Sequence, residues 1–431
     1  MNAAVAAAAS EARYAHRVGT VRVRVLDPAG RPRTGALVSV AQEAHAFGFG
    51  CTGADLLHLA GVGDEGGPAE DPAAATVVAQ WLGLFDTATL PFYWARFEPV
   101  EGRTDTARML RAARWFVERG VTVKGHPLVW HTLAPSWLLG RSDAEVEDAI
   151  RARITRDVTA FAGLVDLWDA INEVVILPVF DKEDNAVTRL AQSRGRVETV
   201  RLAFDAARAA NPAARLVLND FDLSEDYEHL VEDCLEAEIR IDALGLQTHM
   251  HQGFRGAEAV ERILDRFGRF GLPLQLTETS LVSGELMPPE IVDLNDFQTS
   301  DWPSTPEGEE RQRDEVVTHY ETVVAHPAVE SLTYWGMTDA TAWLGAPSGL
   351  VRRDGTPKPA YDALRGLVRG QWWLPPTTLR TDDDGTVEVR GFAGRYAVSA
   401  GVGAEGAGHL APTRATVDVT PGESRADVVL G

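Results

Sequence analysis

Two glutamates each stand at the carboxyl end of a short apolar run. Glu173 follows residues 168–172, and Glu278 follows residues 274–277. A strand buried on both faces reads as a nearly continuous apolar run, so a charged residue at its end points toward the mouth of a parallel barrel. Cleavage of a glycosidic acetal needs a proton donor for the leaving oxygen and a second carboxylate facing the sugar. The pair therefore predicts glycosidase chemistry.

The composition favours a globular protein with a neutral substrate. The chain has 431 residues, of which 45% are hydrophobic and 24% are charged, so it is too long for one small domain. Its 63 acidic and 41 basic residues give a formal net charge of −22. Such a surface repels polyanions, which argues against nucleic acid and anionic membranes as partners. We expect an uncharged carbohydrate as the partner.

No segment of the sequence reads as an export signal or a membrane span. The alanine-rich start, residues 3–9, lacks a basic leading segment and a strongly apolar core. No run approaches the roughly 18 apolar residues that span a bilayer. We therefore expect a cytoplasmic protein, or a secreted one whose signal has been removed. Cys51 and Cys234 are too few for a disulfide framework, so we predict two buried free thiols.

Both termini have the pattern of β-structure. Residues 21–25 alternate valine with arginine, residues 27–30 form a turn and residues 36–40 supply a second β-rich run, which predicts a hairpin within residues 1–45. Residues 371–431 repeat this style between glycine-rich turns. Neither end has enough apolar side chains for a core of its own. We therefore predict that the two ends pair into one small accessory β-sandwich.

Between these ends, residues 46–370 alternate strand-like runs with amphipathic helices. A capping box from Ser142 to Glu145 begins one helix, whose apolar residues recur every three or four positions. Alternating units of this length predict a parallel α/β fold with right-handed crossovers, and about 320 residues suit a TIM (β/α)8 barrel. A doubly wound open sheet is the alternative, although no Gly-x-Gly-x-x-Gly turn opens a helix. The other units are helices near 197–210, 260–267 and 316–324 and strands near 215–218, 274–278 and 331–334.

Six short motifs follow one another in this region. Together they resemble glycoside hydrolase family 10, the retaining β-xylanases, over roughly residues 46–370. Each motif alone is weak, but six in this order with compatible gaps form a specific signal. The motifs are residues 124–131 (KGHPLVWH), 168–173 (WDAINE), 218–221 (LNDF), 245–249 (GLQTH), 276–278 (LTE) and 334–339 (YWGMTD) with Trp343 after it.

The resemblance implies a catalytic TIM barrel and a role for each glutamate. Glu173 would be the acid/base and Glu278 the nucleophile, with carboxyl groups about 5 to 5.5 Å apart for retention of configuration. Two nearby carboxylates also let one stay protonated, because the charge on one raises the pKa of the other. No cofactor and no metal is implied. The substrate-binding residues that the resemblance implies are His126, Trp130, Asn172, Gln247, His249, Trp335 and Trp343, with His249 bonded to Glu278 and with Asn219 and Asp339 supporting loops.

Three features depart from the family pattern. Thr89 and Leu90 stand where the family usually has a Glu-Asn pair, and Tyr93 stands at the position of a lysine. Ser280 replaces an aspartate two residues after the nucleophile, which removes a charge beside His249. The long segment 281–306 is either a wall of the site or a passive surface excursion. These changes leave the glycone preference and the pH optimum open.

We therefore predict a retaining β-glycosidase that hydrolyses β-xylosidic bonds in xylan, xylo-oligosaccharides or β-xylosides, of the endo-1,4-β-xylanase or β-xylosidase type. The departures at Thr89, Leu90 and Tyr93 alter the part of the site that would bind sugars on the non-reducing side of the cleaved bond, which is the glycone side. An exo-acting or aryl β-glycosidase is therefore an alternative. A catalytically silent carbohydrate-binding protein is a second alternative. A metal hydrolase using His126, His131 and Asp169 is disfavoured, since histidines five apart on a strand face opposite sides. The natural sugar and the oligomeric state stay open.

Overall fold

The computed structural model describes residues 12–68, 70–400 and 414–430. Residues 3–9, where the sequence shows no export signal, lie outside these ranges. The chain forms two compact units, one of Phe49–Asp362 and one that joins Met1–Gly48 to Ala363–Gly431. The domain boundaries that the sequence suggested, after residues 45 and 370, stay a prediction.

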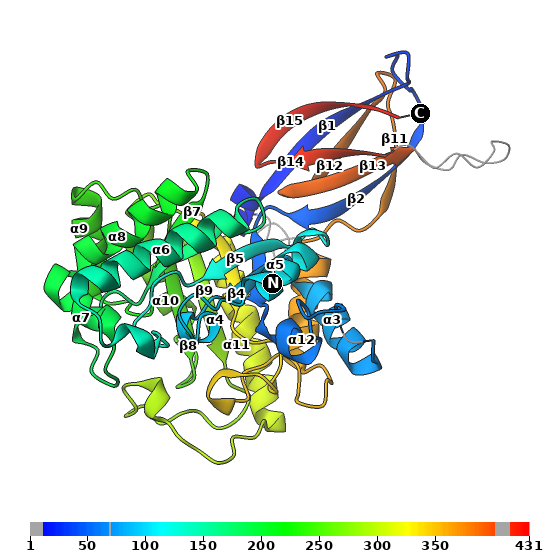
Figure 1. The fold of residues 1–431 in the computed structure, drawn as a ribbon. Coiled ribbons are helices and arrows are strands. Elements are labelled where there is room, and N and C mark those ends of the chain that lie inside the picture. The colour runs from blue at the N-terminus through cyan, green and yellow to red at the C-terminus, as the bar shows by residue number, and fades with distance from the viewer. Residues whose placement is uncertain (1–11, 69, 401–413, 431) are drawn as a thin grey trace. The chain divides into compact units, whose positions relative to one another are not determined.

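The larger unit is built on a closed barrel of parallel strands, in the order β10-β3-β4-β5-β6-β7-β8-β9 (Figure 1). The predicted TIM barrel is confirmed, and the open sheet is wrong. Strand order follows chain order around the ring, so all carboxyl ends of the strands meet at one rim. The strands are β3 (Gly48–Thr52), β4 (Thr87–Pro91), β5 (Thr122–His126), β6 (Leu167–Asn172), β7 (Arg215–Asp220), β8 (Ala243–Met250), β9 (Leu274–Leu281) and β10 (Val329–Tyr334).

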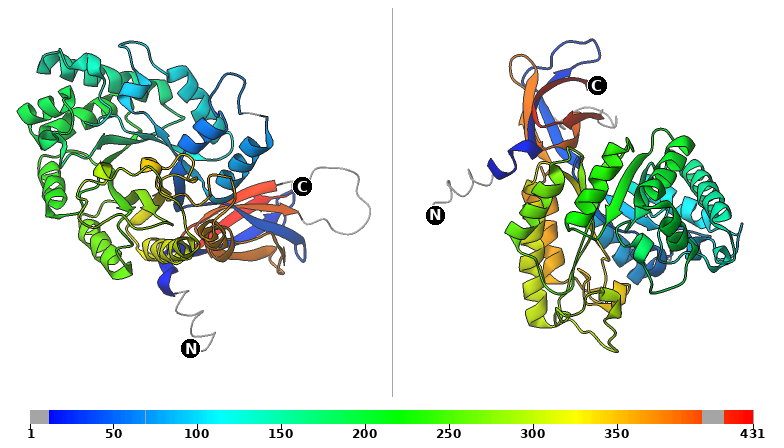
Figure 2. Two further views of the ribbon diagram at one scale, coloured as in Figure 1. Left: turned by 90° about the horizontal axis from the view of Figure 1, so that it is seen from below. Right: turned by 90° about the vertical axis from the view of Figure 1, so that its left-hand side faces the viewer.

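Helices cover the outside of this barrel, as the two views of Figure 2 show. The main ones are α3 (Pro72–Leu84), α5 (Thr106–Val117), α6 (Asp143–Phe161), α8 (Arg196–Ala210), α9 (Glu225–Glu236), α10 (Ala257–Gly268) and α11 (Pro306–Ala325). Shorter helices lie in the connections. These are α2 (Ala54–Leu59), α4 (Trp94–Phe97), η2 (Ser136–Leu138), η3 (Leu177–Val179), α7 (Ala186–Arg194), η4 (Leu294–Asp296), η5 (Trp343–Gly345) and α12 (Pro359–Gly366).

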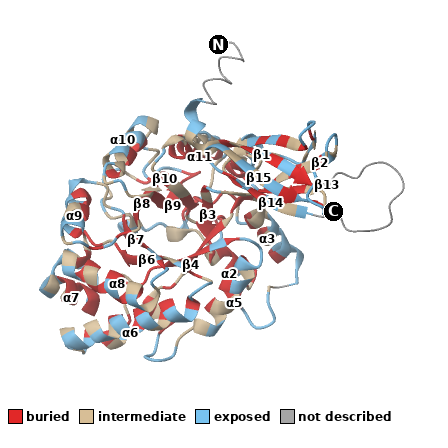
Figure 3. Ribbon diagram, turned by 90° about the horizontal axis from the view of Figure 1, so that it is seen from above, coloured by how far each residue is buried: buried red, intermediate tan, exposed pale blue. Residues whose placement is uncertain are grey.

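Helix α6 shows how the sequence places a helix on the barrel. The Ser142 side chain accepts from the Glu145 amide, and the Glu145 carboxylate accepts from the Ser142 amide 2.8 Å away, so the predicted capping box is present. The periodic apolar side chains are buried toward the strands, whereas the opposite face of the helix is exposed (Figure 3). Those side chains are Val146, Ile150, Ile154, Val158 and Phe161.

Strand β9 is longer than its apolar run indicates. We expected Glu278 to end the strand, but β9 continues to Leu281, and all eight of its residues are buried. The polar residues extend the strand because they find partners on β8. The Thr279 and Thr248 hydroxyls lie 2.7 Å apart, and Ser280 contacts His249 at 2.8 Å. A buried polar side chain with a partner costs little, so polarity alone did not mark the strand end.

The smaller unit consists of two sheets drawn from both ends of the chain. One sheet has the order β12-β1-β15 and the other β11-β2-β13-β14. In Figure 1 the dark blue β1 lies beside the red β15, and the two pair in parallel. Valines from both sheets share one core, which confirms that the termini form extra sheets together. The strands are β1 (Val18–Leu26), β2 (Leu37–His45), β11 (Thr377–Arg380), β12 (Thr386–Phe392), β13 (Gly394–Ala400), β14 (Arg414–Val419) and β15 (Gly422–Val429), flanked by η1 (Ala15–Arg17) and η6 (Leu367–Gln371).

The predicted N-terminal hairpin is wrong. Strand β1 pairs with β12 and β15, whereas β2 pairs with β11 and β13, so the two strands lie in different sheets. The alternating valines identified both strands and their buried faces correctly. Alternation reports which face of a strand is buried and not which strand lies next to it. The long connection over residues 27–36 carries the chain from one sheet to the other.

Two further predictions concern the thiols and the membrane. Cys51 and Cys234 are both free and buried, as predicted. Among the described residues, no helix has the length and apolar character that a bilayer crossing requires.

Candidate active site

Glu173 directly follows strand β6 in an unusual backbone conformation. Its φ is 58°, in the left-handed region that costs a non-glycine residue roughly 1 kcal/mol or more. Two hydrogen bonds to the end of β7 hold this turn. The Glu173 amide donates to the Asn219 carbonyl at 2.8 Å, and the Val175 amide donates to the Asp220 carboxylate at 3.0 Å. Asp220 was not predicted, yet it fixes the backbone that aims the Glu173 side chain.

Glu278 on strand β9 is surrounded by three polar side chains. Asn219 Nδ2 donates to Glu278 Oε1 at 3.1 Å, and His249 Nε2 lies 3.3 Å from Glu278 Oε2. His126 Nε2 lies 3.8 Å from Oε1. Only 7% of the Glu278 side chain is exposed. These contacts come from β5, β7 and β8, so the carboxylate is oriented from several strands at once.

Two amide side chains join the glutamates. Gln247 Nε2 donates to Asn172 Oδ1 at 3.1 Å and to Glu173 Oε1 at 3.2 Å. Asn219 Nδ2 donates to the same Asn172 oxygen at 2.7 Å and to Glu278. This amide bridge places both carboxylates in one site. It uses only the oxygen of Asn172, so the Asn172 Nδ2 group is left to donate to a ligand.

The surroundings of Glu173 favour its protonated form. Trp130 Nε1 donates to Glu173 Oε2 at 2.7 Å, and His131 Nε2 lies 3.6 Å from the same oxygen. Burial raises the pKa of Glu173 to about 8, with a further contribution from the charge of Glu278. Burial also lowers the pKa of His131 to about 4, so this histidine is neutral near pH 7. At neutral pH Glu173 can therefore donate a proton.

The raised pKa of Glu173 predicts a pH-dependent effect of Glu173→Gln on stability. Between an unfolded pKa of about 4.3 and the folded value, the folded protein holds a proton that the unfolded chain has lost, so stability falls as pH rises. Glutamine mimics the protonated acid and removes this loss. We expect the free energy of unfolding near pH 7.5 to rise by about 4 kcal/mol, at roughly 1.4 kcal/mol for each of the roughly three pH units between the unfolded pKa and pH 7.5. Urea unfolding of both proteins measures it. Equal differences at about pH 4 and pH 7.5 would contradict this account.

His126 is held by a buried charged pair. Asp169 Oδ2 lies 2.8 Å from His126 Nδ1, and Asp169 Oδ1 lies 2.7 Å from Lys124 Nζ. Burial alone would raise the pKa of Asp169, but Lys124 and His126 hold it below its usual value. His131 lies beyond the end of β5 rather than on the strand, and it faces Glu173. Of the disfavoured metal-ligand set, His126 and Asp169 therefore contact each other, whereas His131 faces Glu173.

Ser280 links two histidines on the other side of Glu278. Its hydroxyl lies 2.8 Å from His249 Nδ1 and 2.9 Å from His251 Nε2. Burial, together with the nearby His249, lowers the pKa of His251 to about 3. The predicted contact of His249 with Glu278 is therefore continued by the Ser280 hydroxyl and the neutral His251 imidazole, which lie behind His249. We did not predict His251, although its position two residues after His249 places both side chains on one face.

Aromatic side chains flank these polar groups. The Trp335 ring centroid lies 5.3 Å from that of His126, and Trp343 lies 4.8 Å from His249. Trp130 lies 6.3 Å from His126. All of the candidate residues named from the sequence thus belong to one network of contacts around the two glutamates. Their individual roles in binding stay a prediction.

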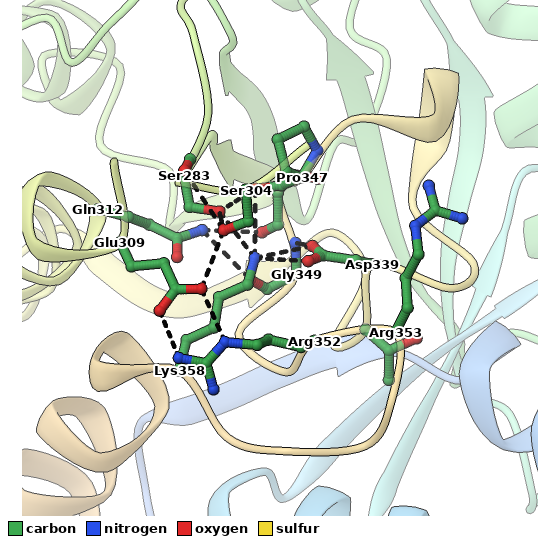
Figure 4. Close-up of polar contacts among 12 residues, drawn as sticks. Ser283, Ser304, Glu309, Gln312, Asp339, Pro347, Gly349, Arg352, Arg353 and Lys358 are labelled. Atoms are coloured by element: carbon green, nitrogen blue, oxygen red, sulfur yellow. Dashed lines mark hydrogen bonds and ion pairs between the residues drawn. The ribbon is translucent and has the colours of Figure 1, made fainter. Parts of the chain in front are cut away.

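A buried ion pair supports the loop that carries Trp343. Figure 4 shows Lys358 directed toward Asp339 and Ser283. Lys358 Nζ lies 2.8 Å from Asp339 and 2.8 Å from the Ser283 hydroxyl, while the Gly349 amide donates to Asp339 at 2.8 Å. These contacts tie the connections after β9 and β10 together. Asp55 reinforces the second one by accepting from the Met337 amide at 2.8 Å.

The segment 281–306 is packed and is joined to the loop that follows Glu173. Lys182 Nζ lies 2.8 Å from Asp296, which links the connections after β6 and β9. Trp302 also contacts His251, with ring centroids 5.8 Å apart. The segment encloses a small apolar cluster made of Val282, Met287, Trp302 and Ala346.

Comparison with known proteins places these residues in a family. The sequence model of glycosyl hydrolase family 10 matches residues 87–366. The endo-1,4-beta-xylanase B of Thermotoga neapolitana is 26% identical over 293 residues, which cover 64% of this chain and 78% of the relative. The xylanase 10B of Thermotoga petrophila, solved with xylobiose, has a TM-score of 0.60 at 21% identity and covers 76% of this chain and 95% of its own. That likeness concerns the fold.

One relative is similar beyond the barrel. The anti-sigma-I factor RsgI6 of Acetivibrio thermocellus is 24% identical over 409 residues, which cover 90% of this chain. An alignment of this length extends into the terminal strands. This chain covers only 46% of that relative, so the likeness concerns one part of a longer protein.

Proposed function

This chain belongs to glycosyl hydrolase family 10, and we propose that it is a retaining β-glycosidase that hydrolyses β-xylosidic bonds by double displacement. The amide bridge carries this proposal. It holds Glu173 and Glu278 on either side of Asn172, whose Nδ2 group is left to meet a sugar hydroxyl. A surface pair of glutamates without such a bridge would have no fixed relation to a single sugar.

In the first step, Glu278 attacks the anomeric carbon while Glu173 gives its proton to the leaving oxygen. The bond between the anomeric carbon and that oxygen breaks, and a glycosyl ester forms on Glu278. His249 and Asn219 orient the attacking oxygens. The raised pKa of Glu173 keeps the proton available near neutral pH.

In the second step, Glu173 acts as a base. The ester on Glu278 carries no charge, so the repulsion that helped to raise the pKa of Glu173 is removed. Glu173 then accepts a proton from water, and the water oxygen attacks the anomeric carbon from the face that the leaving group vacated. Two inversions return the original configuration, and Glu278 is regenerated as a carboxylate.

The aromatic and polar residues support a sugar substrate. Trp335 and Trp343 offer apolar faces to the C–H faces of a pyranose, and His126 and Gln247 offer hydrogen bonds to its hydroxyls. Relatives named as endo-1,4-beta-xylanases and a structural neighbour solved with xylobiose favour a xylosyl unit. The alternatives of an exo-acting or aryl β-glycosidase concern the same site and the same two steps.

A panel of 4-nitrophenyl β-glycosides that differ only in the sugar tests this function. We expect the β-xyloside to be the best substrate, and proton NMR of early time points to show β-xylose before mutarotation. Early α-xylose would contradict the retaining mechanism. No turnover of any glycoside or xylo-oligosaccharide would instead support a catalytically silent carbohydrate-binding protein.

A further inference from the structure

Tyr93 stands beside both catalytic glutamates without being one of the expected binding residues. It follows strand β4 and occupies the N-cap position of helix α4 without a capping hydrogen bond from its side chain. Its ring centroid lies 5.8 Å from that of His126 and 5.6 Å from that of Trp130. His126 faces Glu278, and Trp130 donates to Glu173. The tyrosine therefore forms part of the wall that faces the reacting sugar.

The charges at this site support the same placement. Burial raises the pKa of the Tyr93 hydroxyl, and the negative charges of Glu278 and Glu173 raise it further. No described residue forms a hydrogen bond with the Tyr93 hydroxyl, so this group is available to a ligand.

The backbone under Tyr93 is fixed. The buried Arg153 side chain donates to the carbonyl groups of Phe92 and Pro127, the latter at 3.1 Å. The Phe92 amide donates to the His126 carbonyl at 2.6 Å. On the other side, the Arg96 guanidinium lies 5.9 Å from the Tyr93 ring centroid. Because these contacts fix the backbone, we expect Tyr93 to keep its position when a larger substrate approaches.

The residues from Thr89 to Phe92 offer nothing polar to a second sugar. Thr89, Leu90 and Phe92 are buried. The Thr89 hydroxyl is enclosed in the barrel without a hydrogen-bond partner among the described residues. Tyr93 is therefore the side chain through which the end of β4 meets a ligand.

The roles of Glu173 and Asn172 constrain how the substrate is oriented in the site. The leaving group must extend past Glu173, which protonates it, and Asn172 must meet the 2-hydroxyl side of the reacting sugar. We place the far end of that sugar, which carries the 4-hydroxyl, toward the rings of Trp335 and Tyr93, which both contact His126. A further sugar on the 4-oxygen would need the space that the phenol fills.

We propose that Tyr93 limits the glycone side to one sugar, so that the protein removes single units from the non-reducing end of a β-xyloside or xylo-oligosaccharide. This inference rests on the proposed function and specifies its mode of attack. The hydroxyl of Tyr93 binds the terminal unit, and its ring excludes a second one. Tyr93 is thus a specificity-determining residue for the proposed reaction.

The test compares 4-nitrophenyl β-xyloside with 4-nitrophenyl β-xylobioside, which share a leaving group and differ by one glycone sugar. The readout is the ratio of kcat/KM for direct release of xylobiose from the xylobioside to that for release of xylose from the xyloside, because removal of the terminal unit alone cuts the xylobioside at its inner bond. We expect a ratio below one for the natural protein and at least a tenfold higher ratio for Tyr93→Ala. Tyr93→Phe is the matched control, because it keeps the ring and removes only the hydroxyl. It should keep the ratio within about threefold while kcat/KM for the xyloside falls severalfold.

Three results would overturn the inference. These are a ratio above one for the natural protein, an unchanged ratio in a folded Tyr93→Ala variant, and an increased ratio in Tyr93→Phe equal to that in Tyr93→Ala. If Tyr93→Ala does not fold, early products from xylohexaose decide the question in the natural protein. Xylose as the first product supports the inference, and intermediate oligosaccharides without xylose overturn it. Absence of turnover on both aryl substrates overturns the proposed function itself, which separates the two failures.

Discussion

Replacement of Glu278 with alanine is expected to lower kcat for an aryl β-xyloside by about 10⁵-fold, equivalent to about 7 kcal/mol of activation free energy. The reason is that the attacking carboxylate is lost. The buried partners of Glu278, which are His126, Asn219 and His249, carry no negative charge that could replace it. Steady-state kinetics with an unfolding curve of the variant measures this effect.

Azide identifies the role of the missing group in that variant. A small anion in the vacated space can attack the anomeric carbon and expel the aryl group in a single inversion. We expect azide to restore turnover of Glu278→Ala and to give the α-glycosyl azide. The matched variant Glu173→Ala should give the β-glycosyl azide, because there the anion attacks the ester on Glu278. Identical anomers from the two variants would contradict the assigned roles.

Replacement of Glu173 with alanine is expected to have an effect that depends on the leaving group. General acid catalysis typically contributes 10²- to 10⁴-fold, and a leaving group that needs protonation loses all of it. We therefore expect kcat/KM for a phenyl β-xyloside to fall by about 10³-fold or more. For a 2,4-dinitrophenyl β-xyloside, whose anion leaves without a proton, kcat/KM should change by less than about tenfold.

Glu278→Ala serves as the control for this comparison, since its loss should be large on both substrates. A plot of log kcat/KM against leaving-group pKa for a series of aryl xylosides gives the full answer. The slope should steepen in Glu173→Ala. If the loss is equal across the series, Glu173 is not the proton donor.

The sequence contains enough local information to predict the barrel fold and about half of its strands and helices. The capping box at Ser142 and the periodic apolar residues after it determine the start and the buried face of α6. Apolar runs similarly locate four of the eight barrel strands, β6, β7, β9 and β10. The pairing of β1 and β2 could not be predicted in this way, because the valine pattern identifies a buried face without naming the neighbouring strand. The extension of β9 past Glu278 depended on partners across the sheet, such as Thr248.

Site residues that belong to a sequence motif could be predicted. Residues whose role depends on a contact with a distant part of the chain could not. Glu173, Glu278 and Asn172 lie in motifs whose order the fold preserves. The supporting role of Asp220 depends on a backbone amide of the β6 connection and is invisible in its own motif. The sequence identified Tyr93 only as a departure from the family pattern. The role that we propose for it depends on its contacts with His126 and Trp130.

The central claim is that Glu278 forms a covalent bond with a sugar that Glu173 has released from its leaving group. The most direct measurement is mass spectrometry of the protein after incubation with 2,4-dinitrophenyl 2-deoxy-2-fluoro-β-xyloside, whose fluorine slows hydrolysis of the intermediate. We predict a mass increase of one fluoroxylosyl unit, located by peptide mapping on Glu278. Release of dinitrophenolate without an adduct, or an adduct on another residue, would contradict the account.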